Sequence, residues 1–310
     1  MQDDTDVIVE SVNFLSEGIR CAADLYRPAR MAGKPAPALV LATGFAGVKE
    51  SSADAARFFA ASGYVALAID YRSFGNSDGE PRGQAFPLRQ AEDVRSAITY
   101  LETRQDVDPA RIGIWGTSYG GGIALYAGAV DRRAKIVISQ IPVVDGRLWH
   151  QTLRTSEQYT QLLDALDEDR RQRFRGAPSR RIPVTAHGAT GGFAAMPADA
   201  EIVGLLDPAH AAPSWSPTVT LESVEKIIEY SPEAMIDRIA PRPLMIVTVS
   251  GYDIIHPVAD VLRAYDRARE PKEIVILPYT QLGLYGGAGL AEALAHQLRF
   301  LQRHLPAASA

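Results

Sequence analysis

Short apolar runs alternate along the chain with stretches whose apolar residues recur at helical spacing. The runs cover residues 38–43, 65–70, 112–116, 136–140, 244–249 and 273–277. They are almost continuously apolar, as parallel strands covered by helices on both faces must be. The intervening pattern predicts helices over 52–62, 88–103, 118–129, 257–268 and 289–304. This alternation predicts an α/β fold with a mostly parallel sheet flanked by helices.

Two regions depart from this alternation. Near the start, "DVIVESVNF" and "IRCAADLYRP" predict an antiparallel pair of strands. Between residues 143 and 235 no convincing parallel strand is found, and the sequence is rich in Arg, Ala and Pro, with a charged stretch "DALDEDRRQRFR". This region predicts a mostly helical insertion between the sixth and seventh strands, which leaves 1–142 and 236–310 as the core.

The insertion is interpreted as a cap over a substrate pocket. Insertions at the carboxyl ends of parallel strands lie where ligands bind in α/β folds. The region also carries scattered aromatic residues: Trp149, Tyr159, Phe174, Phe193, Trp215 and Tyr230. The alternative is a surface excursion without a functional role.

Composition narrows the class of protein. The chain has 310 residues, of which 46% are hydrophobic and 22% charged, as in ordinary soluble globular proteins. A net charge of −5 argues against a general nucleic-acid surface. The single cysteine, Cys21, excludes an internal disulfide, and the acidic start "MQDDTDVIVE" lacks the layout of a signal peptide. No apolar run approaches the roughly 20 residues that span a bilayer. We expect a cytoplasmic protein that binds neither nucleic acid nor membrane.

The stretch "IWGTSYGG", residues 114–121, carries the strongest chemical signal. Its G-x-S-x-G pattern lies between a predicted strand and a predicted helix, where it presents a serine nucleophile on a sharp turn. Ser118 is therefore the candidate nucleophile. Two backbone N–H groups are needed to stabilise the negative charge that develops on the attacked carbonyl. The candidates are the N–H of Tyr119 and that of Phe45, which lies in the glycine-containing loop "LATGFAGVKE".

With these motifs the sequence resembles the α/β-hydrolase superfamily, and within it the dienelactone-hydrolase-like and polyketide-transferase-like bacterial members. The matching stretches are "GFAGVKE", "DYRSFGNSDGEPR", "DPARIGIWGTSYGGG", "ISQIPVVDG" and "RPLMIVTVSGYDIIHP". The resemblance implies a triad in the chain order Ser, Asp, His, with Asp253 as the acid. It places the histidine in the loop after the last strand, "LPYTQLGLYGG", where this chain has Gln281. The usual His-Gly of the oxyanion loop is Thr43-Gly44 here.

The resemblance therefore implies a degenerate triad, Ser118–Asp253–Gln281. A glutamine amide does not accept a proton near neutral pH, so Gln281 cannot serve as a general base. His256, three residues after Asp253, is the best substitute, although a residue at the start of the following helix is expected to point along the sheet edge. His150 and His187 of the insertion are weaker alternatives. Gln281 is either an introduced substitution or natural divergence, and the parallel change at Thr43 favours divergence.

Three functions remain open on the sequence. The first is a capped serine hydrolase or acyltransferase that acts on an ester, thioester or C–C bond of a medium-sized apolar substrate. The second is a non-hydrolytic cyclase, lyase or isomerase of secondary, polyketide-like metabolism that uses the oxyanion hole and pocket. The third is a binding module without catalysis. The six histidines form no spaced ligand cluster, so neither a metal nor another cofactor is expected. The expected partner is a small-molecule substrate, and the resemblance admits a homodimer.

Overall fold

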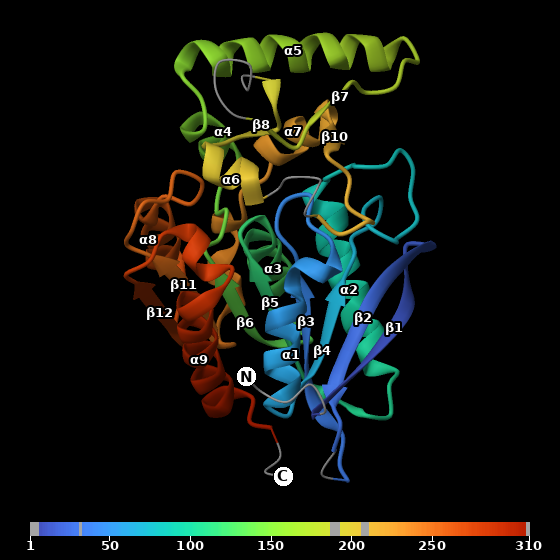
Figure 1. Ribbon diagram of the computed structural model, residues 1–310, viewed down its shortest axis with the longest axis vertical. Helices are drawn as coiled ribbons and strands as arrows, with labels where there is room; N and C mark the ends of the chain where they lie inside the picture. Colours follow the sequence, from blue (N-terminus) through green and yellow to red (C-terminus); the bar gives the residue numbers. More distant parts are fainter. Residues whose placement is uncertain (1–5, 31–32, 187–192, 206–210, 308–310) are drawn as a thin grey trace.

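The fold is built on one central sheet (Figure 1). The structure is a computed structural model that describes residues 6–30, 33–186, 193–205 and 211–307. The sheet has eight strands in the order β1-β2-β4-β3-β5-β6-β11-β12. Their bounds are β1 Val7–Ser16, β2 Ile19–Pro28, β3 Ala36–Ala42, β4 Val65–Ile69, β5 Val107–Thr117, β6 Ala134–Gln140, β11 Leu244–Val249 and β12 Lys272–Leu277. β1, β2 and β4 are successively antiparallel, and all other pairings are parallel. The predicted α/β class, the six strands and the opening antiparallel pair are confirmed. The predicted burial is wrong for β12, which lies at the edge of the sheet, is only half-buried and leaves Ile276 exposed.

Helices cover both faces of this sheet, and each face has its own apolar core. α1 (Ala53–Ala61) and α9 (Gly287–His304) contribute to the core on one face. α2 (Pro87–Glu102), α3 (Tyr119–Val130) and α8 (Val258–Arg267) contribute to the core on the other face. All five predicted helices are present. Because both faces are covered, the central strands are buried along their whole length, which explains their uninterrupted apolar sequence.

The segment between β6 and β11 lies above the carboxyl ends of the parallel strands (Figure 1). Its elements are α4 Gly146–Thr152, α5 Ser156–Phe174, β7 Arg181–Pro183, β8 Thr185–Ala186, β9 Met196–Pro197, α6 Ala200–Leu205, β10 Thr218–Thr220 and α7 Leu221–Ile228. Most of its regular structure is helical, as predicted. The expectation that it holds no parallel strand is wrong, because β8 and β9 pair in parallel. Each is two residues long, which is too short to leave a hydrophobic pattern in the sequence.

Two further observations concern membrane-spanning helices and the single cysteine. None of the helices in the described residues combines the length and apolar character needed to cross a membrane. Cys21 lies inside β2 with no exposed surface, and burial raises the pKa of its thiol to about 12. A thiol in that state is not a nucleophile near neutral pH, so Cys21 is a small core residue.

The turn from β5 into α3 depends on a very close approach between backbones. A Cβ atom on Gly116 would lie 2.2 Å from the carbonyl oxygen of Gly120. A Cβ atom on Gly120 would lie 2.2 Å from the carbonyl oxygen of Thr43 and 2.3 Å from that of Ala42. These contacts leave no room for any side chain, so glycine at both positions allows α3 to start directly against β3.

We expect Gly120→Ala to destabilise the fold, because α3 must move away from the backbone at the end of β3. Overpacking of this kind costs roughly 1–3 kcal/mol, measurable as a lower free energy of unfolding in urea. The matched control is Gly204→Ala in α6, where a Cβ atom would meet nothing within 4 Å. That exposed helical position should be unchanged or stabilised by about 0.5–1 kcal/mol. Equal effects of the two substitutions would contradict the close-approach argument.

Candidate active site

Ser118 occupies the strained turn between β5 and α3. Its backbone has φ 56° and ψ −126°, a conformation that residues with a side chain rarely adopt. Such strain persists only where the surroundings enforce it, and it is typical of nucleophiles presented at a turn. The residue is 7% exposed, and its side chain faces a cavity at the carboxyl ends of the strands.

Asp253 and His256 lie together in a turn that follows β11. The Asp253 Oδ1 atom accepts hydrogen bonds from the N–H groups of Ile255 (3.0 Å) and His256 (2.7 Å). These bonds close the turn and bring the imidazole back over the carboxylate, so that His256 Nδ1 lies 3.0 Å from Asp253 Oδ2. The two side chains are 2% and 3% exposed. The sequence therefore builds acid and base into one four-residue turn.

The imidazole of His256 joins this turn to Ser118. Its Nε2 atom lies 2.8 Å from Ser118 Oγ, within hydrogen-bonding distance. If Nδ1–H donates to the carboxylate, Nε2 is left unprotonated and can accept the proton of the serine hydroxyl. The three side chains thus form a continuous Ser–His–Asp relay with the chain order Ser, Asp, His.

This geometry differs from the degenerate triad expected on the sequence, Ser118–Asp253–Gln281. His256 was expected to point along the sheet edge because it was assigned to the start of a helix. α8 begins only at Val258, after Pro257, and His256 belongs to the turn closed by Asp253. The signal available in the sequence was the spacing Asp-x-x-His directly before a proline.

Gln281 lies elsewhere in the same cavity. It is the first residue of a short 3₁₀ helix, η6 (Gln281–Leu284), and is 4% exposed. Its side chain lines the cavity that contains Ser118 and His256. Among the residues that the structure describes, Gln281 makes no hydrogen bond to Ser118 or Asp253. Its position is that of a group available to a bound substrate.

Tyr285, directly after η6, lines the cavity and was not among the site residues expected on the sequence. Burial raises the pKa of its hydroxyl, and hydrogen bonding to Thr117 and Ser118 partly offsets that rise. A protonated phenol in contact with Ser118 adds a hydrogen-bonding group beside the nucleophile.

Of the two candidate oxyanion residues, Phe45 lines this cavity and Tyr119 directly follows Ser118 in the chain. Phe45 and Ser118 line it together, and a Cβ atom on Gly44 would lie only 3.7 Å from that of Ser118. Tyr119 is the first residue of α3, so its N–H precedes the hydrogen-bond ladder of the helix and has no partner within the helix. The Phe45 ring packs edge-on against Tyr119, at 5.7 Å between centroids, and against Trp149 of α4, at 5.6 Å.

The loop that carries Phe45 is held at its end, at Lys49, by buried polar contacts. The N–H of Lys49 donates to Asp70 Oδ1 at 2.7 Å, and the Lys49 ammonium pairs with Asp24 at 2.5 Å. Both side chains of that ion pair are largely buried. Breaking such a buried pair costs several kcal/mol, so these contacts hold the loop in one conformation.

The cavity has a volume of about 280 Å³ and is mostly apolar. Two of its residues, Met196 and Ile202, come from the segment between β6 and β11, and Ile255 and Leu282 contribute from the loops after β11 and β12. The backbone of the Met196 strand is held by Arg154, whose guanidinium donates to the carbonyls of Ala194 and Ala195. That segment therefore forms part of the wall facing Ser118.

The other histidines considered as bases are placed away from Ser118 or not described. His150 is fully buried, and its Nδ1 atom faces the Arg154 guanidinium at 3.0 Å. Burial and then Arg154 lower the pKa of His150 well below its usual value, so its ring is neutral. His187 lies outside the described residues. No group of three or more metal-ligand side chains occurs in the part of the chain that is described.

Comparisons with known proteins agree with this fold. The X-Pro dipeptidyl-peptidase (S15) family matches residues 17–278. A polyketide transferase, claH of Penicillium crustosum, is 28% identical over 303 residues, covering 96% of this chain and 97% of its own. The quorum-quenching protein AidA of Acinetobacter baumannii is 32% identical over 299 residues, with 95% of each chain covered. The crystal structure of the α/β hydrolase GrgF from a Penicillium species superposes with a TM-score of 0.81 at 27% identity, covering 96% and 99%.

The fold, the strand order and these relatives define an α/β-hydrolase-fold enzyme with hydrolase or transferase activity. Within that class, the chain belongs to the S15 family. The resemblance to the α/β-hydrolase superfamily and its polyketide-transferase-like members is confirmed.

The hydrogen bonds of the turn predict a spectroscopic signature. A proton held between His256 Nδ1 and Asp253 should give a far-downfield imidazole resonance in the proton NMR spectrum, because a charge-assisted hydrogen bond deshields it. We expect this resonance to disappear in Asp253→Ala and in His256→Gln and to persist in the control Gln281→Ala. A downfield resonance that survives His256→Gln would assign the proton to another histidine.

Proposed function

We propose that this enzyme is a serine hydrolase or acyltransferase that uses Ser118 as nucleophile, His256 as general base and Asp253 as the orienting acid. The observation that carries the proposal is the 2.8 Å contact between Ser118 Oγ and His256 Nε2. A serine hydroxyl is a weak nucleophile until an adjacent base accepts its proton. The contact supports His256, which the sequence analysis named as the best substitute, as the base in place of Gln281.

The reaction follows from this geometry. As Ser118 Oγ attacks the substrate carbonyl carbon, its proton passes to His256 Nε2, and Asp253 stabilises the imidazolium that forms. The N–H groups of Phe45 and Tyr119 donate to the carbonyl oxygen as it becomes negatively charged. His256 then gives the proton to the leaving oxygen, sulfur or carbon, which leaves an acyl-serine. Water or an acceptor hydroxyl or thiol, deprotonated by His256, attacks the acyl carbon, and His256 returns this proton to Ser118 Oγ as the acyl–serine bond breaks.

The substrate class is an ester, thioester or activated C–C bond with a medium-sized apolar acyl group. An apolar cavity of about 280 Å³ supports this choice, since it is close to the lower limit of pockets that bind small molecules. Relatives named polyketide transferase, acyltransferase and thiohydrolase point to the same bond types. Residues 143–235 would then act as a cap that covers the bound acyl chain.

The hydrogen-bonded base favours acyl transfer over a cyclase, lyase or isomerase reaction of secondary metabolism. A non-hydrolytic enzyme would need the oxyanion hole and pocket but gains nothing from a histidine aimed at a strained serine. The cytoplasmic compartment and the homodimer remain expectations from the sequence. Sedimentation of the purified chain tests the oligomeric state.

Removing either end of the relay should abolish turnover. We expect Ser118→Ala and His256→Gln each to lower kcat for short p-nitrophenyl esters by about 10⁴- to 10⁶-fold, because one missing member disables the triad. A fluorophosphonate probe should label the unchanged protein rapidly and His256→Gln slowly. His150→Gln is the control and should label at the unchanged rate. Rapid labelling of His256→Gln would place the base elsewhere.

Gln281 provides a second test, because the resemblance puts the histidine of the superfamily at this position. We expect Gln281→His alone to change kcat by less than about tenfold, since the relay through His256 is already complete. In the double variant His256→Gln/Gln281→His, the new imidazole lies in the same cavity as Ser118 and should restore part of the activity lost in His256→Gln.

The control for the double variant is His256→Gln/Gln281→Asn, which keeps an amide at position 281. A double variant with histidine that is no more active than this control would show that position 281 does not reach Ser118. A large gain from Gln281→His in the presence of His256 would instead mean that His256 is not the working base.

A further inference from the structure

A second cavity, unrelated to the site at Ser118, lies at the opposite end of the sheet. It has a volume of about 540 Å³ and is formed by the end of α3, the start of β6 and the residues between the 3₁₀ helix η5 (Ile236–Ile239) and β11. Ser118 follows the carboxyl end of β5, whereas this cavity precedes the amino ends of β6 and β11. The seven residues of β6 separate the two ends, a length of about 20 Å for an extended strand.

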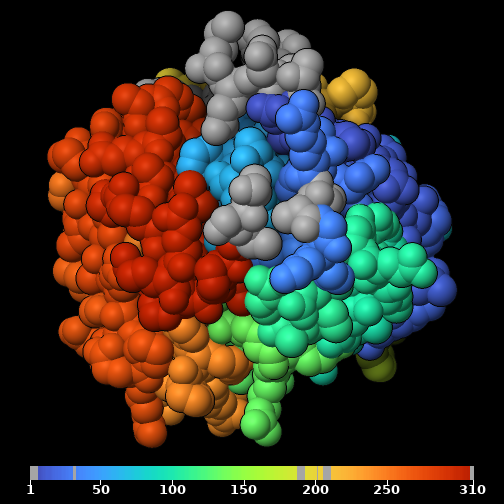
Figure 2. Space-filling view, turned by 90° about the horizontal axis from the view of Figure 1, so that it is seen from below, coloured from blue at the N-terminus to red at the C-terminus, as the bar shows by residue number. Residues whose placement is uncertain are grey.

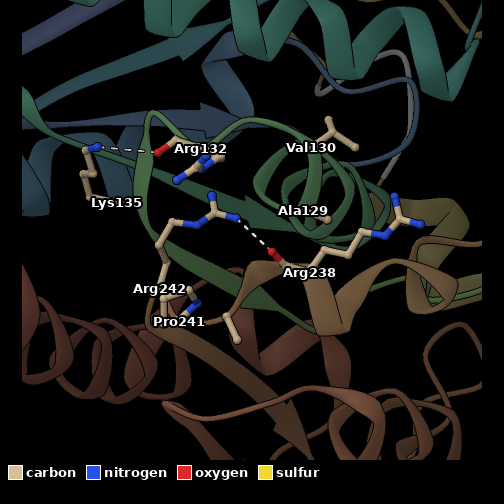
Figure 3. A pocket seen from close by; sticks show the side chains of 8 residues that line it. Ala129, Val130, Arg132, Lys135, Arg238, Pro241 and Arg242 are labelled. Carbon is tan, nitrogen blue, oxygen red and sulfur yellow. Dashed lines mark hydrogen bonds between the residues drawn. The ribbon is translucent and has the colours of Figure 1, made fainter.

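The two chain segments that form this cavity are far apart in sequence and adjacent in space. In the view from below, the segment near residue 130 (green) and that near residue 240 (orange) lie side by side at the lower edge (Figure 2). The close view shows the side chains of Arg132 and Arg242 between them, with Lys135 and Arg238 on either side (Figure 3).

The polar lining of this cavity is entirely cationic. It consists of Arg132, Lys135, Arg238 and Arg242, with small apolar residues such as Ala129 and Pro241 completing the wall. In the described part of the chain none of these four cations forms an ion pair with a carboxylate. Four unpaired cations around one hollow are unusual in a protein whose net charge is −5.

The nearest carboxylates along the chain are engaged with other arginines. Asp131 pairs with Arg133 at 2.6 Å, and Asp237 faces Arg269 at 3.8 Å. Burial lowers the pKa of Arg242, the neighbouring Asp131 opposes this, and the positive charge of Arg132 lowers it further. The Asp131 carboxylate therefore acts on Arg242 against the repulsion from Arg132, whereas Arg132, Lys135 and Arg238 form no ion pair in the described part of the chain.

A structural role accounts for only part of this cluster. Arg242 donates to the carbonyls of Asp131, Ala134 and Arg238 and so ties the end of α3 to the start of β11. Arg132 and Arg238 are exposed, and their guanidinium groups have no comparable bonds. The Lys135 ammonium reaches only the carbonyl of Arg132, at 3.5 Å. Three of the four cations are thus free to bind a ligand.

We propose that this cavity is a binding site for a phosphate-bearing small molecule. Guanidinium groups match the planar pairs of phosphate oxygens, and an ammonium adds a point charge. A diphosphate carries enough negative charge to satisfy the facing cations, and the volume admits a group as large as a nucleoside attached to it. Because the site lies at the far end of the sheet, the ligand takes no part in the chemistry at Ser118.

The experiment is calorimetric titration of the unchanged protein with inorganic diphosphate at low ionic strength. We expect a dissociation constant below about 1 mM that weakens as salt is added, because exposed charges are screened. ADP and adenosine are the comparison ligands. Tighter binding of ADP than of diphosphate identifies a phosphate ester as the ligand class, equal binding identifies a free anion, and adenosine should not bind.

The test variant is Arg132→Gln/Lys135→Gln, which removes two exposed charges and leaves the structural contacts of Arg242 in place. We expect diphosphate binding to weaken by about tenfold or more, with esterase activity unchanged. The control is Arg175→Gln/Arg299→Gln, which removes the same charge from exposed positions outside the cavity and should bind as the unchanged protein does. Equal weakening of diphosphate binding in both variants would mean that net charge, and not this cavity, determines binding. That result, or an absence of binding to the unchanged protein, would overturn the proposal.

Discussion

The backbone contact between α3 and the end of β3 is the constraint on which the site depends. Gly120 lies against the carbonyls of Ala42 and Thr43 with no space for a side chain, so α3 must begin immediately at the sheet. This contact forces the turn at Ser118 into positive φ and presents its hydroxyl above the strand ends. It also brings the start of α3 beside the loop that follows β3, where Phe45 lies. The proposed nucleophile and both candidate oxyanion donors are therefore positioned by one packing contact.

Asp253 and His256, the proposed acid and base, are positioned by a second and independent set of contacts. One carboxylate oxygen of Asp253 accepts hydrogen bonds from two N–H groups of its own turn, and the other lies within hydrogen-bonding distance of the His256 imidazole. A carboxylate that closes a turn in this way is a common local motif. Here the motif also orients a ring toward Ser118, so local backbone chemistry and the proposed proton transfer rest on the same side chain. The strand β11 has only to place this turn at the carboxyl edge of the sheet.

The sequence predicted the fold in detail because the central strands are buried on both faces and the helices are amphipathic, which are strong periodic signals. Ser118 could equally be predicted, since Gly116 and Gly120 on either side of it form a recognisable pattern and are required by close backbone contacts. His256 was underestimated because its orientation depends on hydrogen bonds to Asp253 rather than on periodicity. The two-residue strands β8 and β9 left no pattern to read. The contact of Tyr285 with Ser118 depends on how η6 folds back over the cavity, which no short-range pattern encodes.

The location of His256 changes what the loop after β12 is free to do. In a triad drawn from two loops, that loop must hold a catalytic imidazole within a few tenths of an ångström, which limits every neighbouring residue. Here the proposed acid and base share the turn after β11, and Gln281, Leu282 and Tyr285 line the cavity without belonging to the proposed triad. Under the proposed mechanism, proton transfer and substrate selection reside on separate segments of the chain. The range of acyl groups could then change through substitutions in the loop after β12 while the proposed acid and base stay intact.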